Sequence, residues 1–179
     1  AYEILCSDGV QTCALPIFRR AKISIDMVSI TDQKEVTSSH NVTITADKTL
    51  SEVNFEEAEM LILPGGIPGT PNLRACTALC EKLKEFAANG KKVAAVCAAP
   101  TVLGELGILE GKKATCYPSF ADKLATGDYV KQPVVTDDNV ITSRGMGTCI
   151  EFAGAIIAAL KDKATADAVK EAIIYNDVY

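Results

Sequence analysis

The stretch KVAAVCAAPTVLG, residues 92–104, turns from an apolar strand directly into a helix. Alanine and valine on both sides of Cys97 are small enough for a sharp turn that lifts one side chain out of a sheet, the geometry of a nucleophile elbow. A sulfur at a helix start meets unpaired N–H groups, which favour the thiolate and lower the thiol pKa below about 8.5. Cys97 is therefore the candidate nucleophile, and the alternative is a small apolar residue that ends a buried strand.

Strands and helices alternate on both sides of this stretch. Apolar runs rich in β-branched residues predict strands, several of them central, at residues 23–30, 42–45, 60–63 and 93–96. Helical patterns cover residues 75–88, 98–106, 119–125, 149–160 and 164–175, and residues 133–136 and 139–143 form an inserted hairpin. The alternation predicts one domain, residues 1–179, built as a three-layer α/β/α sandwich with a mostly parallel sheet.

The charge and hydropathy of the sequence limit the kinds of molecule that the protein is expected to bind. The 179 residues carry a net charge of −5 with no basic stripe, which gives little support to nucleic-acid binding. No apolar run approaches the roughly 20 residues that span a bilayer, so we expect a soluble protein without membrane contact. Its partners are then expected to be small molecules or a second copy of the chain.

The other cysteines do not form a catalytic or metal-binding pattern. Cys76 and Cys80 are four residues apart on one predicted helical face, which is typical of core positions. Cys116 is expected in a short strand and Cys149 near the start of a late helix. With His40 as the one histidine, predicted to lie in a turn, no metal-ligand spacing is present and we expect no metal. Seven cysteines at irregular spacing are typical of the reducing cytoplasm.

Two further loops are expected beside Cys97, because ligands collect at the carboxyl ends of parallel strands. In LILPGGIPG, residues 61–69, the bare backbone of Gly65 and Gly66 can offer N–H donors to an oxyanion, although Pro-Gly-Gly is also an ordinary turn sequence. In ITSRGMGT, residues 141–148, Arg144 either contacts a substrate or fixes neighbouring backbone.

Five segments together resemble the ThiJ/PfpI superfamily, and within it the branch of the parkinsonism-associated deglycase and its bacterial relatives. They are RRA at 19–21, LPGG at 63–66, VCAAPT at 96–101, GKKATCYP at 111–118 and TSRG at 142–145. The resemblance implies a flavodoxin-like, class I glutamine amidotransferase-like fold, a homodimer and a reactive cysteine at Cys97. The activities it implies are cofactor-free conversion of methylglyoxal and glyoxal to hydroxy acids and removal of early glycation adducts.

The resemblance assigns roles that these residues can perform chemically. The Cys97 thiolate adds to an aldehyde to give a hemithioacetal, while the backbone of Gly65, Gly66 and Ala98 stabilises the oxyanion. Tyr117 stands where some relatives have a histidine. A phenol with a reference pKa near 10 is a poor base, so Tyr117 is a candidate for orienting substrate or simply an aromatic that packs over Pro118.

One residue of the family pattern is missing. In the family, a glutamate between the first strand and first helix shares a proton with the cysteine, whereas residues 7–16 contain none and Val10 stands at the expected position. The sequence VQTCALPI, residues 10–17, matches the translation of a common sequencing adapter, so we expect about residues 7–17 to be an artefact that replaces a natural segment with glutamate. The alternative is an ordinary loop or first helical turn.

A second class of function stays open. Related members act as redox sensors or holding chaperones, in which oxidation of the residue matching Cys97 to sulfenic or sulfinic acid is the signal. A cysteine amidase or peptidase has less support, because that branch commonly has a histidine directly after the nucleophile and Ala98 stands there.

Overall fold

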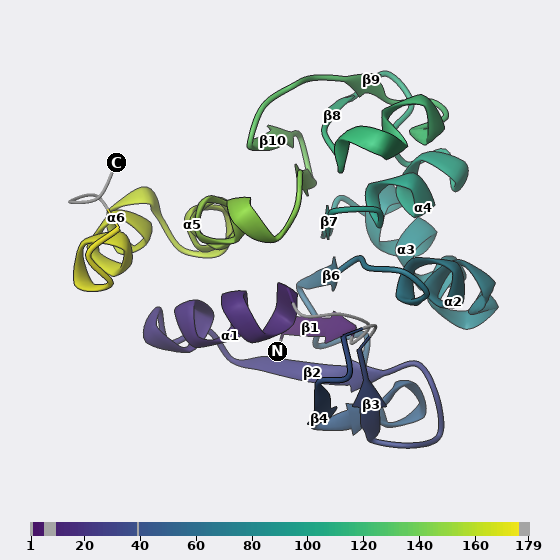
Figure 1. Ribbon diagram of the computed structural model, residues 1–179, viewed down its shortest axis with the longest axis horizontal. Coiled ribbons are helices and arrows are strands. Elements are labelled where there is room, and N and C mark those ends of the chain that lie inside the picture. Colours follow the sequence, from purple (N-terminus) through teal and green to yellow (C-terminus); the bar gives the residue numbers. More distant parts are fainter. Residues whose placement is uncertain (1, 6–9, 39, 176–179) are drawn as a thin grey trace.

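A seven-stranded sheet forms the middle layer of the computed structural model, which describes residues 2–5, 10–38 and 40–175 (Figure 1). Its strand order is β10-β11-β7-β6-β1-β2-β5, and every neighbouring pair is parallel except the antiparallel pair β10 and β11. The strands are β1 (Tyr2–Leu5), β2 (Ile25–Ser29), β5 (Lys48–Thr49), β6 (Met60–Leu63), β7 (Lys92–Val96), β10 (Val134–Asp137) and β11 (Val140–Ser143).

Helices cover both faces of the sheet, so the predicted three-layer α/β/α sandwich is confirmed. Figure 1 places one group to the left of the sheet, made of α1 (Val10–Arg20), α5 (Cys149–Leu160) and α6 (Lys163–Ala172). The other group lies to the right and consists of α2 (Gly69–Ala75), α3 (Thr77–Ala88) and α4 (Pro100–Glu105). Within the described residues, no helix combines the length and the apolar character that a membrane crossing requires.

Strand β7 is apolar from Val93 to Val96 because helices cover both of its faces. Ala94 and Val96 pack with the left-hand helices, and Val93 and Ala95 pack with the right-hand helices. All four are fully buried, because successive side chains of a strand point to opposite faces and each face here is covered by helices. The same strand carries the chain directly into Cys97.

Several predicted elements differ in the structure. Residues 42–45 do not form a central strand: β4 (Thr43–Thr45) pairs with β3 (Glu35–Thr37) in a separate two-stranded sheet, because Thr43 and Thr45 are exposed and only Ile44 is half-buried. The hairpin is not an insertion, since β11 pairs in parallel with β7.

The helices of the structure also differ from the predicted helices in their bounds and, in one case, in their type. The pattern at 75–88 is split, because the backbone of Cys76 is extended and separates α2 from α3. The predicted helix at 98–106 begins only at Pro100 and ends at Glu105. The predicted helix at 119–125 is the 3₁₀ segment η2 (Pro118–Lys123). Cys116 lies beyond the short strand β8 (Lys113–Ala114), which pairs with β9 (Asp128–Tyr129).

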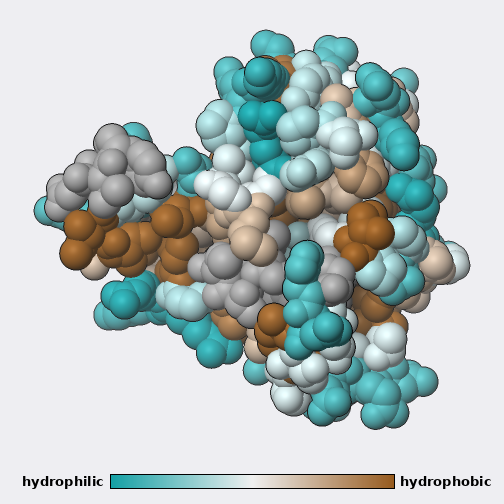
Figure 2. Space-filling view, in the orientation of Figure 1, coloured by the Kyte–Doolittle hydropathy of each residue, from teal (hydrophilic) through white to brown (hydrophobic). Residues whose placement is uncertain are grey.

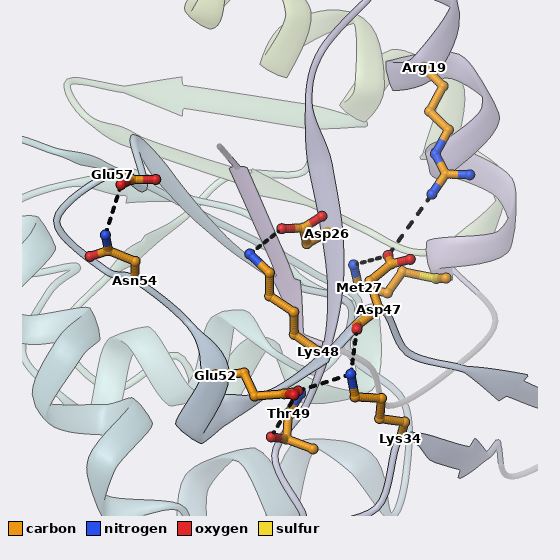
Figure 3. A network of polar contacts seen from close by, with 10 residues as sticks. All are labelled: Arg19, Asp26, Met27, Lys34, Asp47, Lys48, Thr49, Glu52, Asn54 and Glu57. Atoms are coloured by element: carbon orange, nitrogen blue, oxygen red, sulfur yellow. Dashed lines mark hydrogen bonds and ion pairs between the residues drawn. The ribbon is translucent and has the colours of Figure 1, made fainter.

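A polar network fixes the β2 to β5 edge of the sheet (Figure 3). Asp47 accepts a 2.8 Å hydrogen bond from the amide of Met27, and Lys34 donates to the carbonyl of Asp47 at 2.9 Å. Lys34 also pairs with Glu52 at 3.1 Å, and the Thr49 amide and Lys34 together lower the pKa of Glu52. Because β1 and β6 separate β2 from β7, this network supports the edge of the sheet and lies apart from the strand that leads to Cys97.

Candidate functional site

Cys97 has a left-handed backbone, with φ +63°, between the end of β7 and the start of α4. A side chain other than glycine rarely adopts this conformation, and it costs about 1–3 kcal/mol. Hydrogen bonds on both sides hold the turn: the Cys97 amide donates to the Ser143 carbonyl at 3.0 Å, and the Tyr117 amide donates to the Cys97 carbonyl at 2.8 Å. The segment 141–148, which was predicted to lie beside Cys97, is therefore joined to the elbow through the backbone of Cys97, and so is the segment that carries Tyr117.

Gly65 packs directly against this turn. Its φ is +83°, and a Cβ added to it would lie 2.3 Å from the Val96 carbonyl oxygen and 2.9 Å from the Cys97 Cβ. Only a residue without a side chain fits such an approach. The Pro-Gly-Gly sequence is thus a close contact with the elbow as well as a turn.

Two backbone N–H groups beside Cys97 are available to a ligand. Within the residues that the structure describes, the amides of Gly66 and Ala98 donate no hydrogen bond, whereas the Ala99 amide donates to the Val96 carbonyl at 3.1 Å. Of the amides that follow Cys97, Ala98 is therefore the available one. The Ala99 amide is used within the turn that precedes α4.

A series of side-chain hydrogen bonds fixes the backbone carbonyl of Ala98. The Thr101 hydroxyl donates to the Ala98 carbonyl at 2.7 Å, and Arg74 Nη2 donates to Thr101 Oγ1 at 3.2 Å. Arg74 Nε in turn pairs with Glu105 Oε2 at 2.7 Å. Sequence reasoning missed Thr101 and Arg74. A threonine four residues after the cysteine, at an otherwise apolar helix start, was a usable signal for Thr101, whereas nothing in the sequence pointed to Arg74.

Tyr117 and Arg144 frame the other side of the turn. Tyr117 is 49% exposed, and its ring lies over Gly145, where an added Cβ would be 3.6 Å from Tyr117 Cδ2. Arg144 is half-buried and its amide donates to the Pro133 carbonyl at 3.2 Å. The Arg144 Nε atom is buried, and no described residue accepts a hydrogen bond from it. Both predicted substrate-site residues therefore sit in segments that contact the elbow or flank it.

The remaining cysteines that the structure describes are less suited to react than Cys97, which is half-buried. Burial and then the neighbouring Cys97 raise the pKa of Cys116 to about 11, and its side chain is fully buried. Cys149 is 3% exposed at the first turn of α5. Cys76 and Cys80 are half-buried rather than core residues, and burial raises the pKa of Cys80.

The expected position of the family glutamate is the first residue of α1. Val10 begins this helix, while residues 7–9 of the foreign-looking segment lie outside the described residues. Farther along, Ala14, Leu15 and Ile17 of the same segment are buried in the core between α1 and α5. Among the described residues, no three His, Cys, Asp or Glu side chains come together as a metal site.

An α/β/α sandwich with a mostly parallel sheet and a left-handed cysteine at a sharp strand-to-helix turn defines a flavodoxin-like protein with a nucleophile elbow. The chain belongs to the DJ-1/PfpI family, whose model matches residues 8–159. It is 36% identical over 165 residues to the zebrafish Parkinson disease protein 7 homolog, covering 90% of this chain and 87% of the relative. A Caenorhabditis elegans relative named glutathione-independent glyoxalase is 38% identical over 120 residues, which cover 66% of this chain and 63% of the relative.

Solved structures of the family have the same fold. Drosophila melanogaster DJ-1beta superposes with a TM-score of 0.91 at 32% identity, covering 97% of this chain and 96% of the other. Toxoplasma gondii DJ-1, solved in an oxidized form, gives a TM-score of 0.89 at 32% identity over the whole of both chains. DJ-1 homolog A of Arabidopsis thaliana is 37% identical over 163 residues, which cover 89% of this chain but only 42% of the relative. DJ-1 homolog B of the same plant is 36% identical over 151 residues, which cover 83% of this chain and 34% of the relative.

Proposed function

We propose that this protein is a cysteine-dependent, cofactor-free glyoxalase or deglycase that acts on methylglyoxal, glyoxal or early glycation adducts. The observation that carries the proposal is the left-handed turn at Cys97, flanked by the unpartnered amides of Gly66 and Ala98. The name of the nematode relative supports the same kind of chemistry. We further propose that the protein works in the cytoplasm as a homodimer.

The reaction begins with addition of the Cys97 thiolate to the aldehyde carbon of methylglyoxal. A carbon–sulfur bond forms, the carbonyl π bond breaks, and the oxygen gains negative charge where the two amides can donate to it. Protonation of this oxygen gives the hemithioacetal.

A proton then moves from the former aldehyde carbon to the neighbouring carbon by way of an enediol, which converts the hemithioacetal into a thioester of lactate. Water hydrolyses the thioester and regenerates the thiol, so the net reaction adds one water to methylglyoxal to give lactate. In this proposal Tyr117 and Arg144 orient the substrate oxygens, since each side chain can donate a hydrogen bond.

The proton transfer needs a base, which the present chain lacks at position 10. We propose that the natural protein has a glutamate there. The test is lactate formation from methylglyoxal by a chain that carries Val10→Glu within a family-like loop, with and without Cys97→Ala. Cys97→Ala should abolish turnover, whereas Cys80→Ala, which removes another half-buried thiol, should not; turnover that survives Cys97→Ala overturns the proposal.

A redox sensor or holding chaperone is the second candidate, and the half-buried thiol at the elbow favours it too. It predicts that a folded, restored chain forms no lactate but suppresses aggregation of a client protein only after peroxide treatment. Loss of that effect in Cys97→Ala would support it.

A further inference from the structure

Arg74 joins the two segments that carry the amides of Gly66 and Ala98. It lies in the last turn of α2, the helix that follows the Gly66 loop, and its guanidinium reaches Thr101 in the first turn of α4. The start of α2 is bonded to the same loop, because the Thr70 amide donates to the Gly66 carbonyl at 2.8 Å. The helix α2 is therefore tied to Gly66 at its start and, through Arg74, to α4 near its end.

The chemistry of arginine fixes the direction of these hydrogen bonds. A guanidinium can only donate, so Thr101 Oγ1 accepts from Arg74 Nη2 at 3.2 Å and directs its own hydrogen to the Ala98 carbonyl at 2.7 Å. A hydroxyl that accepts a bond from a cation becomes a stronger donor. The Ala98 carbonyl also accepts from the Thr101 amide at 3.1 Å, so the backbone of Ala98 is held between Cys97 and α4.

Glu105 holds Arg74 in this orientation. Its Oε2 atom accepts from Arg74 Nε at 2.7 Å, so one guanidinium bonds Glu105 and Thr101 through two different nitrogens. The planar guanidinium offers its donors at fixed angles, which a lysine ammonium cannot reproduce. The side chains of Arg74 and Glu105 are 44% and 42% exposed, and ion pairs with this exposure contribute little to stability. The pair is thus better suited to orienting the buried Thr101 hydroxyl than to stabilising the fold.

We infer that Arg74 is a positioning residue, which acts through Thr101 to hold the Ala98 amide beside the Gly66 amide, where both can donate to the oxygen of a Cys97 adduct. This inference rests on the proposed function, because the adduct is the hemithioacetal with which that reaction begins. Arg74 itself does not touch the substrate. Its removal leaves both amides in the chain but breaks the link that holds α2 and α4 in register.

The test measures how strongly methylglyoxal protects Cys97 of the present chain from iodoacetamide. Addition of the thiol to the aldehyde forms a carbon–sulfur bond, breaks the carbonyl π bond and leaves the thiol proton on the oxygen, so the sulfur is blocked while the adduct lasts. The ratio of alkylation rates without and with methylglyoxal gives the dissociation constant of the adduct. Arg74→Ala should raise this constant about threefold to tenfold, the effect of losing one well-placed hydrogen bond.

Two comparisons separate positioning from a general structural effect. Iodoacetamide alone places no charge on an oxygen at the amides, so its rate at Cys97 should change less than about twofold in Arg74→Ala. Arg19→Ala removes another exposed arginine that has an ion pair, to Asp47 at 3.9 Å, and should leave the dissociation constant unchanged. A constant for Arg74→Ala no higher than that for Arg19→Ala would overturn the inference.

A double-mutant comparison tests the route through Thr101. Thr101→Val removes the hydroxyl, so adding Arg74→Ala to it should not raise the dissociation constant further. Thr101→Ser keeps the hydroxyl, so the effect of Arg74→Ala should persist in that background. Equal effects of Arg74→Ala in the two backgrounds would overturn the assignment. Urea unfolding of each variant checks that folded proteins are compared.

This result is separable from that of the proposed reaction, because protection requires addition of the aldehyde but no turnover. Protection by methylglyoxal without lactate formation in the restored chain would count against the proposed reaction and leave the role of Arg74 standing. No protection at all in the present chain would contradict both.

Discussion

Gly65 lies so close to Cys97 that a Cβ added to the glycine would be 2.9 Å from the Cys97 Cβ and 2.3 Å from the carbonyl oxygen of Val96. The loop after β6 therefore has a fixed position relative to the elbow. A single substitution at Gly65 tests whether this contact shapes the site.

Gly65→Ala should destabilise the fold and slow alkylation of Cys97. The added methyl group meets backbone, and overpacking of this kind costs about 1–3 kcal/mol beyond the strain of a positive φ. Gly107→Ala is the matched control, because its φ is +76° but nothing lies within 4 Å of the added Cβ. Urea unfolding and iodoacetamide labelling of both variants provide the comparison, and equal effects would show that backbone strain alone matters.

Cys97 should be the one described cysteine that limited iodoacetamide labels quickly in the folded protein. Cys116 should stay unlabelled at pH 7 and also at pH 9, because its pKa of about 11 keeps the thiol protonated at both values and its side chain is fully buried. Peptide mapping by mass spectrometry after brief exposure gives the site of modification. Preferential modification of Cys116 or Cys149 would contradict the assignment.

Thr101→Val should lower stability by about 1–3 kcal/mol, since it leaves a buried carbonyl of Ala98 and a donor of Arg74 without their partner. The valine keeps the shape of threonine, so packing changes little. Thr126→Val serves as the control, because it removes a 3.2 Å bond to the Gly104 carbonyl from an exposed residue. A Thr101 variant no less stable than the Thr126 variant in urea would show that the bond to Ala98 does not support the elbow.

The chain as it stands should convert methylglyoxal poorly, and glutamate at position 10 within a family-like loop should raise the rate about 10²- to 10⁴-fold. This is the usual contribution of general acid–base catalysis to an otherwise complete site. Lactate formation is followed for both chains at equal protein concentration. Equal activity would mean that another group supplies the base.

Self-association should give a species of twice the 19.0 kDa chain mass. This expectation comes from the family, and the surface is compatible with it: Figure 2 shows apolar side chains gathered at the left, where Figure 1 places α5 and α6. Ile174, just beyond α6, is 61% exposed. Sedimentation at micromolar concentration measures the mass, and a single species near the chain mass would count against a dimer.

Much of the fold was predictable because its signals are local. The continuous apolar run of β7 and the small residues around Cys97 indicated a central strand and a tight turn, and the structure has both. The error at residues 42–45 arose because β-branched residues identify a strand without identifying its partner. Thr43 and Thr45 alternate with Ile44 as in a strand with one exposed face, which fits the peripheral pairing with β3.

The sequence by itself determined the alternation of strands and helices, the position of the elbow and Cys97 as its apex, since each depends on side-chain size and hydrophobic period over a few neighbouring residues. Only the tertiary structure decided which groups stand around that cysteine. The approach of Gly65 to Cys97 and the bond from Arg74 to Thr101 join residues 32 and 27 positions apart in the sequence. Such contacts depend on how helices pack across the sheet, and hydrophobic period specifies which face is buried but not which residue of a distant element meets it.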